Sequence, residues 1–151
     1  MASSLVKVDI HLTFHVKSTG IPMRSEDLPR IFQYIGGLIG NIGGIAIEVG
    51  GVCDHVHILT TLPKTMAVAD FVRTIKANSS KWIRQISDYY LPFCWQDGYG
   101  AFSVSPSLIE KTVNYIRNQE KHHKKISFRD EYKLFLERYG IDYDERYAFG
   151  D

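Results

Sequence analysis

Hydrophobic and polar residues alternate strictly from Leu5 to Val16, which is the pattern of a strand with one buried face. Two more apolar runs, Asn41–Val49 and Val52–Thr61, predict a second and a third strand, with Gly50-Gly51 as the tight hairpin turn between them. A short fourth strand is expected within residues 95–105, after a turn. Four strands of this length are enough for one small sheet.

Apolar residues at helical spacing predict four helices between and after these strands. Pro29 is tolerated in the first turn of the first helix, and Ser107 with Glu110 has the spacing of a capping box before the third. Ser127 can cap the fourth helix, which Gly140 ends. The predicted helices run from Ser25 or Asp27 to about Ile39, from about Met66 to Tyr89, from about Leu108 to His123, and from Ser127 through Tyr139.

The order strand, helix, strand, strand, helix, strand, followed by two helices, predicts an α+β fold. It is a ferredoxin-like βαββαβ antiparallel sheet with additional C-terminal helices. In this arrangement the first and third strands are central neighbours, and helices cover one face of the sheet. The 151 residues, of which 44% are hydrophobic and 13% aromatic, suit a single domain over 1–151. Because such a fold hosts many functions, the function has to be argued from a site.

Cysteine content and hydropathy indicate where the protein works. The chain has two cysteines, Cys53 and Cys94, which do not make a disulfide framework. The opening residues alternate instead of forming an apolar run, so neither a signal peptide nor a transmembrane stretch is predicted. We therefore expect a cytoplasmic protein with no membrane partner.

Charge is distributed unevenly along the chain, although the net charge is only +1. Residues 64–85 hold five basic residues and one acid, and residues 111–133 hold seven basic residues and three acids, so each segment carries a local +4. Residues 137–151 carry −3. Basic helices beside an acidic tail are compatible with a polyanion partner, while solvated helix faces are the plainer interpretation.

Two histidines, His55 and His57, interrupt the apolar third strand. Because side chains alternate along a strand, both imidazoles point to one face, while Val56 and Ile58 point to the other. Two imidazoles roughly 7 Å apart along a strand can converge on one divalent ion. The alternative is that each is satisfied by backbone or water, although an unsatisfied polar group on a central strand is costly.

A third ligand and a nucleophile are available on the predicted third helix, within NYIRNQEKHH. Tyr115 and Gln119 are four residues apart and therefore share one face, and His123 follows one turn later. Taken alone, Tyr115 is most simply a packed tyrosine and Gln119 a surface amide. They become candidates only together with the histidine pair.

The motif DHVHIL, followed after one helix and one strand by YIRNQ, closely resembles the single-tyrosine HUH transposases of the IS200/IS605 type and their REP-associated relatives. The resemblance covers nearly the whole chain, including VRTIKANSSKWI in the middle helix. It implies that His55 and His57 are metal ligands for Mg²⁺ or Mn²⁺, that Gln119 is the third metal-binding side chain, and that Tyr115 is the catalytic nucleophile. No second tyrosine lies one turn along this helix, which separates the chain from two-tyrosine replication initiators.

The resemblance also implies a reaction and its partners. The protein would be a transposase that cleaves and rejoins single-stranded DNA carrying hairpins, through a 5′-phosphotyrosine intermediate. It would be a homodimer formed by joined sheets, in which a tyrosine helix can serve the partner's histidines. Basic residues expected to contact DNA phosphates are Lys76, Lys81, Arg84, Arg117, Lys121, Lys124 and Lys125.

Two function classes other than a transposase stay open at this point. A non-catalytic RRM-like module that binds single-stranded nucleic acid has the same fold, but the RNP1 pattern is missing and histidines stand where stacking aromatics are expected. A metal-dependent phosphoesterase would use His55 and His57 with water. A covalent protein–DNA adduct separates the transposase from both.

Overall fold

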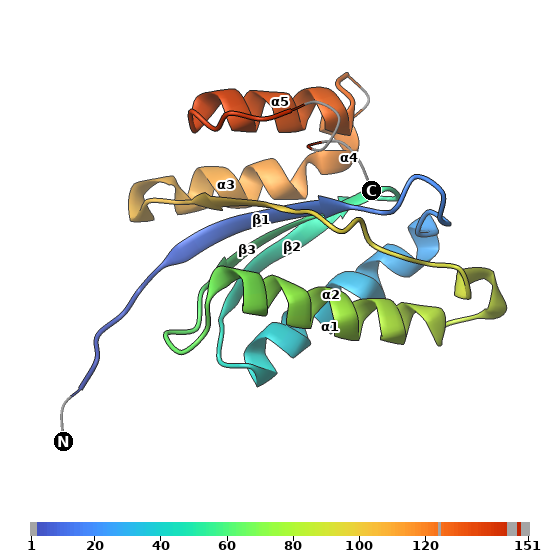
Figure 1. Ribbon diagram of the computed structural model, residues 1–151, viewed down its shortest axis with the longest axis horizontal. Coiled ribbons are helices and arrows are strands. Elements are labelled where there is room, and N and C mark those ends of the chain that lie inside the picture. Colours follow the sequence, from blue (N-terminus) through green and yellow to red (C-terminus); the bar gives the residue numbers. More distant parts are fainter. Residues whose placement is uncertain (1–2, 124, 145–147, 149–151) are drawn as a thin grey trace.

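The computed structural model describes residues 3–123, 125–144 and 148. Its centre is a four-stranded antiparallel sheet with the strand order β2-β3-β1-β4 (Figure 1). This order confirms the ferredoxin-like prediction, with the first and third strands as the central pair. The strands are β1 (Asp9–His15), β2 (Ala46–Val52), β3 (His55–Thr61) and β4 (Gly100–Ser103).

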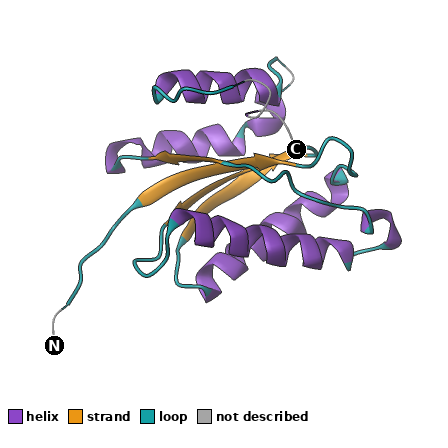
Figure 2. Cartoon of the chain, in the orientation of Figure 1, coloured by secondary structure: helices purple, strands orange, loops and turns teal. Residues whose placement is uncertain are grey.

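Helices lie on both faces of the sheet, whereas the sequence predicted helices on one (Figures 1 and 2). α1 and α2 pack on one face, and the additional C-terminal helices lie on the other. The described helices are α1 (Leu28–Asn41), α2 (Val68–Arg84), α3 (Ile109–Arg117), α4 (Gln119–His122) and α5 (Phe128–Arg138). Short 3₁₀ turns lie at Ser25–Asp27, Asp88–Tyr90 and Pro106–Leu108.

Both faces of β1 are buried, although its alternation predicted a half-buried strand. Leu12 and Phe14 enter the core beneath α1 and α2. His11, on the polar face, is buried against the rings of Tyr115 and Phe135 from the C-terminal helices. The second layer of helices therefore encloses the polar side chains that the alternation had placed in solvent.

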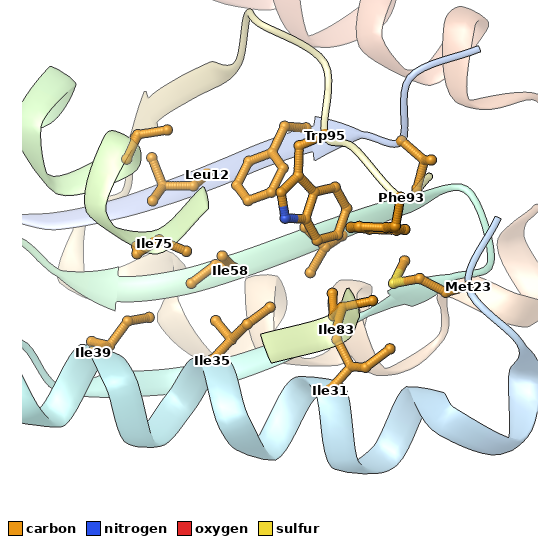
Figure 3. Close-up of a cluster of buried hydrophobic side chains, with 14 of the residues drawn as sticks. Leu12, Met23, Ile31, Ile35, Ile39, Ile58, Ile75, Ile83, Phe93 and Trp95 are labelled. Carbon is orange, nitrogen blue, oxygen red and sulfur yellow. The ribbon is translucent and has the colours of Figure 1, made fainter. Parts of the chain in front are cut away.

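The main hydrophobic core fills the space between the sheet and helices α1 and α2 (Figure 3). α1 contributes Ile31, Ile35 and Ile39, which share one face because they are four residues apart. Leu12 of β1 and Ile58 of β3 meet them from the sheet. Burial of each of these side chains stabilises the fold by about 1.5–3 kcal/mol. Ile58 points away from the histidine pair, as the strand period predicts.

The hairpin between β2 and β3 turns at Cys53 and Asp54, so the predicted turn at Gly50-Gly51 is wrong. α1 continues to Asn41, and β2 begins after it and includes both glycines. The turn residues are instead the last two before the histidine strand.

The two glycines of β2 allow close packing instead of a turn. A Cβ on Gly50 would lie 2.7 Å from Ile116 Cγ2, so glycine lets α3 approach this strand. Gly51 has φ +150°, and a Cβ there would collide with the carbonyl oxygen of His55. The close approach at Gly50 places α3, the helix that carries Tyr115, against the sheet.

The helix predicted over Leu108–His123 is divided into α3 and α4. The break is at Asn118, where φ is −96° and ψ is 19°. The predicted capping box does not form, because Ser107 Oγ pairs with Ser105 Oγ at 3.0 Å and a 3₁₀ turn precedes α3. The two pieces still follow one another closely, since the Asn118 amide donates to the carbonyl oxygen of Asn114.

The signals at the ends of α5 are confirmed, and the cap predicted for α1 is not. Ser127 Oγ accepts a hydrogen bond from the Asp130 amide at 3.2 Å, and Gly140 follows the helix with φ +65°. Asp27 precedes α1, but its carboxylate accepts from the Tyr90 hydroxyl at 2.6 Å instead of capping the helix. A tertiary contact has therefore replaced a local one at that end.

Candidate metal and tyrosine site

Two fully buried histidines of β3 face the C-terminal helices. His55 and His57 are each 0% exposed, on the sheet face opposite the main core. Gln119, the first residue of α4, places Oε1 3.0 Å from His55 Nε2. The ring of Tyr115 on α3 lies 5.7 Å from the ring of His57, between centroids. The structure thus brings the four predicted residues together within one chain.

Asp54 in the hairpin turn determines how His55 presents its second nitrogen. A carboxylate can only accept, so its 2.7 Å bond to His55 Nδ1 places a proton on that nitrogen. This hydrogen bond lowers the pKa of Asp54. In a neutral His55 the lone pair of Nε2 then faces the amide oxygen of Gln119, whose nitrogen donates to Glu131. Two acceptors facing each other at this distance suit a cation.

His57 is hydrogen-bonded at both ring nitrogens. Nε2 donates to Glu131 Oε1 at 2.9 Å, so Nδ1 accepts from His11 Nε2 at 2.7 Å. Burial lowers the pKa of His57 to about 4, and burial together with His57 lowers the pKa of His11 well below its usual value. Both rings are therefore neutral near pH 7. His11 therefore holds the ring of His57 by donating to Nδ1, whereas Asp54 holds the ring of His55 by accepting from Nδ1.

Glu131 of α5 connects the other site residues. It is 2% exposed, and its carboxylate accepts hydrogen bonds from His57 Nε2, the Tyr115 hydroxyl and Gln119 Nε2. Burial opposes its charge, but contacts with His123 and His57 hold the pKa of Glu131 well below its usual range. Burial, and then the charge of Glu131, raise the pKa of Tyr115 well above its usual value. In this arrangement Tyr115 is a neutral phenol bonded to a carboxylate.

The end of α4 brings two more imidazoles beside this carboxylate. The Nε2 atoms of His122 and His123 lie 3.1 and 3.3 Å from Glu131 Oε2, buried but without a well-aligned hydrogen bond. One ligand atom from each of His55, His57, His123 and Glu131 lies within 4.8 Å of the others. Imidazole and carboxylate donors that converge in this way fit a divalent ion.

Two of the predicted DNA contacts have an intramolecular role in the structure. Lys76 Nζ donates to the carbonyl oxygens of residues 96, 97 and 98 at 2.8, 3.0 and 2.5 Å, and burial lowers the pKa of Lys76 to about 8. Arg84 donates to the carbonyl oxygen of Phe93 at 3.1 Å. Both side chains hold the segment between α2 and β4, and phosphate binding by them stays a prediction.

The other predicted DNA contacts that the structure describes lie on the surface. Arg117 pairs with Glu48 at 3.2 Å. Trp82 stacks on Tyr34 with 4.5 Å between ring centroids. Lys124 lies outside the described residues. The exposed lysines that remain are Lys81, Lys121 and Lys125.

Sequence reasoning missed two residues that the structure brings to this site, Glu131 and His11, and it noted His123 without grouping it with the histidine pair. His11 had a usable signal, because it lies on the polar face of a strand predicted to neighbour the histidine strand. The strand pairing confirms that β1 and β3 are neighbours, since Thr13 of β1 lies opposite His57 of β3. Glu131 had none, since one acid on a short charged helix is ordinary.

Comparison with sequence families identifies the chain. Residues 4–119 match the family described as transposase IS200 like, Y1_Tnp. This protein belongs to the IS200-like transposases. The resemblance carried by DHVHIL and YIRNQ is thereby confirmed.

Two solved structures share the fold of this IS200-like transposase. One is a presumed transposase from Deinococcus radiodurans, with a TM-score of 0.60 and 18% identity over 79% of this chain and 95% of that one. The other is a REP-associated tyrosine transposase bound to a REP hairpin, with a TM-score of 0.59 and 12% identity over 83% of this chain and 74% of that one. No significant relative was found among curated proteins.

The matched family segment of this transposase ends at Gln119. It contains His55, His57 and Tyr115, whereas α5 and Glu131 lie beyond it. Among the residues that the structure describes, no helix is long and apolar enough to span a membrane.

Proposed function

We propose that this transposase cleaves and rejoins single-stranded DNA at hairpin ends through a 5′-phosphotyrosine on Tyr115. The observation that carries the proposal is the convergence of Tyr115 and Gln119 with two buried histidines, in a chain of the transposase family. Hairpin DNA is the proposed substrate because a protein of similar fold is bound to a REP hairpin.

The proposed step exchanges one phosphoester for another. The Tyr115 oxygen bonds to phosphorus while the bond to the 3′-oxygen breaks, and the phenol proton ends on that oxygen. Because the phosphodiester energy is kept, a free 3′-hydroxyl can reverse the step without ATP. Burial and the charge of Glu131 raise the pKa of Tyr115, so this phenol is a poor nucleophile while the contact with Glu131 persists.

His55, His57 and Gln119 would hold the divalent ion of this reaction, with Mg²⁺ or Mn²⁺ as candidates. When bound, the ion would act as a Lewis acid that withdraws charge from the phosphate oxygens. Asp54 and His11 fix the orientation of the two histidine rings through hydrogen bonds to their Nδ1 atoms. Mg²⁺ prefers oxygen donors and imidazole tolerates Mn²⁺ better, so the histidines favour Mn²⁺.

DNA can reach these ligands only when α5 moves, because His55 and His57 have no exposed surface. α5 is anchored by a small cluster, in which Tyr132 and Leu136 pack with Phe102 of β4 apart from the main core. An element with few buried contacts opens at a lower free energy than the core does. Cleavage would therefore require local opening of α5.

Leu136→Ala is expected to increase the cleavage rate, because it loosens α5. Loss of a buried leucine costs about 2–5 kcal/mol, here mainly in the docking of this helix. Hydrogen exchange should quicken in α5 and stay unchanged in the sheet. The control Ile35→Ala removes similar bulk from the main core and should lower the melting temperature without faster cleavage. Faster exchange of α5 without faster cleavage would contradict the opening step.

Affinity for single-stranded hairpin DNA is expected to fall steeply with salt. If about six phosphates are contacted, binding should weaken by roughly 10³-fold or somewhat less between 50 and 200 mM salt. Lys121→Ala, at an exposed position, should flatten the slope by about one. Lys76→Met should lower the melting temperature, because three carbonyl oxygens lose their donor, and should also flatten the slope by about one if the predicted phosphate contact of Lys76 is made. A flat slope in the unmodified protein would contradict a charged DNA interface.

A homodimer remains a proposal from the family resemblance. The position of Tyr115 favours sites in which each chain uses its own tyrosine. Tyr115 lies beside the histidines of its own chain. A mixture of Tyr115→Phe and His57→Ala chains is therefore expected to stay inactive, since each chain lacks one essential group. Activity restored in such mixed dimers would show that the tyrosine helix serves the partner's histidines.

Denaturing gels with labelled single-stranded hairpin DNA decide between the proposed function and its two alternatives. A DNA-linked protein band supports the transposase. Cleavage without linkage would indicate a metal-dependent phosphoesterase, and binding without cleavage an RRM-like module. Membership of a transposase family favours the first outcome.

A further inference from the structure

We propose that His123 and Glu131 join His55 and His57 in a four-ligand site for a divalent transition metal ion, closed by α5. The inference rests on the proposed function for the histidine pair and deepens it. It adds two ligands that the sequence did not predict. It also predicts a different preferred ion for the closed protein, in which α5 covers the site.

The four side chains converge on one buried point from three parts of the fold. Their ligand atoms all lie within 4.8 Å of one another. Glu131 Oε1 is 2.9 Å from His57 Nε2 and 3.8 Å from His55 Nε2, and Glu131 Oε2 is 3.3 Å from His123 Nε2. The rings of His55 and His123 are 4.3 Å apart between centroids. Side chains of β3, the end of α4 and α5 therefore meet at one carboxylate.

The imidazole of His123 lies beside the Glu131 carboxylate, in a position that suits a cation shared by the two groups. Its Nε2 is buried and has no well-aligned hydrogen-bond partner, and the side chain is only 10% exposed. Buried polar atoms are normally satisfied. The nearby carboxylate of Glu131 already accepts from His57 and Tyr115. A cation would use the lone pair of His123 and the carboxylate together.

The surroundings orient the ligand nitrogens toward this point. Asp54 and His11 bond to Nδ1 of His55 and His57, so that Nε2 of each ring is directed at Glu131 or Gln119. An ion on His57 Nε2 would replace the proton that this nitrogen donates to Glu131, and Nδ1 would then donate a proton to His11 Nε2. Phe128 stacks on His55 with 4.4 Å between ring centroids. Outer contacts of this kind fix ring orientation and strengthen imidazole as a metal ligand.

Three imidazoles and one carboxylate select against Mg²⁺. Mg²⁺ prefers oxygen donors and keeps several waters, whereas imidazole suits Zn²⁺ and related ions. Four protein ligands are typical of closed zinc sites, while catalytic sites keep one position open. The closed protein should therefore prefer Zn²⁺ or Co²⁺ to Mg²⁺.

Position in the chain links this site to the closed state. His123 and Glu131 both follow Gln119, where the matched family segment ends, and Glu131 is carried by α5. An ion held by all four side chains would fasten α5 to the sheet. When α5 leaves, Glu131 leaves with it, and a DNA phosphate oxygen can take the place of the carboxylate as an anionic donor.

Metal binding to the full chain tests the site without a cleavage assay. Calorimetry with Zn²⁺ should give one ion per chain, and Co²⁺ should give the intense visible bands of four-coordinate cobalt, which excess Mg²⁺ does not remove. Glu131→Gln and His123→Ala should each weaken Zn²⁺ binding by at least about tenfold. Lys121→Ala is the matched control, since this residue is exposed on the same short helix and is outside the four-residue group, and should keep full affinity.

Hydrogen exchange gives a second readout for the same variants. Zn²⁺ should slow exchange in α5 of the unmodified protein, because the ion ties Glu131 to β3. It should not slow exchange in Glu131→Gln, a near-isosteric variant whose circular dichroism spectrum should match that of the unmodified protein. Equal slowing in both proteins would show that the ion does not use Glu131 and would overturn the proposal.

The results separate this proposal from the proposed function. Unchanged Zn²⁺ affinity in both Glu131→Gln and His123→Ala, with loss in His57→Ala, would overturn the four-ligand site and leave the transposase site on His55, His57 and Gln119. Zn²⁺ binding as expected, without any DNA-linked protein, would support the metal site and overturn the proposed strand transfer.

Discussion

Tyr115→Phe is expected to abolish both cleavage of single-stranded hairpin DNA and formation of the DNA-linked protein. Phenylalanine keeps the contacts of the ring with His57 and Phe135, which lie 5.7 and 5.8 Å away between centroids, but it has no oxygen to bond phosphorus. Product should therefore not exceed the background without protein. Denaturing gels with end-labelled DNA measure both the cut strand and the adduct.

The fold and DNA affinity of Tyr115→Phe should remain close to those of the unmodified protein. The substitution removes a hydrogen bond to the charged Glu131 carboxylate, a loss of about 1.5–3 kcal/mol in the free energy of unfolding. Tyr34→Phe is a matched control, because Tyr34 stacks on Trp82 from α1, on the other side of the sheet. If Tyr115→Phe still gives a DNA-linked band, another tyrosine is the nucleophile.

His57→Ala is expected to remove metal binding and cleavage together. The substitution deletes one of the few ligand atoms of the metal site, so no divalent ion should restore activity. It also leaves His11 Nε2 without its hydrogen-bond partner, at a cost of about 1–3 kcal/mol, and removes one of the hydrogen bonds that Glu131 accepts. Calorimetry with Mn²⁺ and a cleavage assay, both below the melting temperature, measure the two effects.

Thr13→Val separates loss of the ligand from loss of stability. Thr13 lies opposite His57 in the sheet, and its hydroxyl donates to the carbonyl oxygen of Val56 at 3.0 Å. Valine removes this buried hydrogen bond but no metal ligand, so it should lower the melting temperature and keep Mn²⁺ binding. Unchanged Mn²⁺ binding in His57→Ala would show that His57 is not a ligand.

The sequence by itself determined the order of the elements and the strand and helix faces that carry the chemistry. These properties are local, because side-chain direction follows the backbone period of each element. His55 and His57 share a face for this reason, and Tyr115 and Gln119 lie one turn apart even across the break at Asn118. The end of α5 at Gly140 is equally local, since glycine readily adopts the positive φ found there.

Tertiary packing decided the position of the hairpin turn and the role of the basic residues. Gly50-Gly51 has the composition of a turn, but Gly50 is where the sheet meets Ile116, so the chain turns later. Lys76 reads as a surface charge on an amphipathic helix, yet it is partly buried and holds three carbonyl oxygens. Neither outcome depends on residues near in sequence, and local patterns therefore could not predict them.

The tertiary structure alone also decided what completes and closes the site. Glu131 is far from the histidines in sequence, and its contact with His57 exists because α5 packs through Leu136 and Tyr132 onto the sheet. The same packing buries the polar face of β1, which its alternation assigned to solvent. A helix that lies over a sheet face converts exposed polar positions into a buried network, and only the docking of that helix decides which residues the network contains.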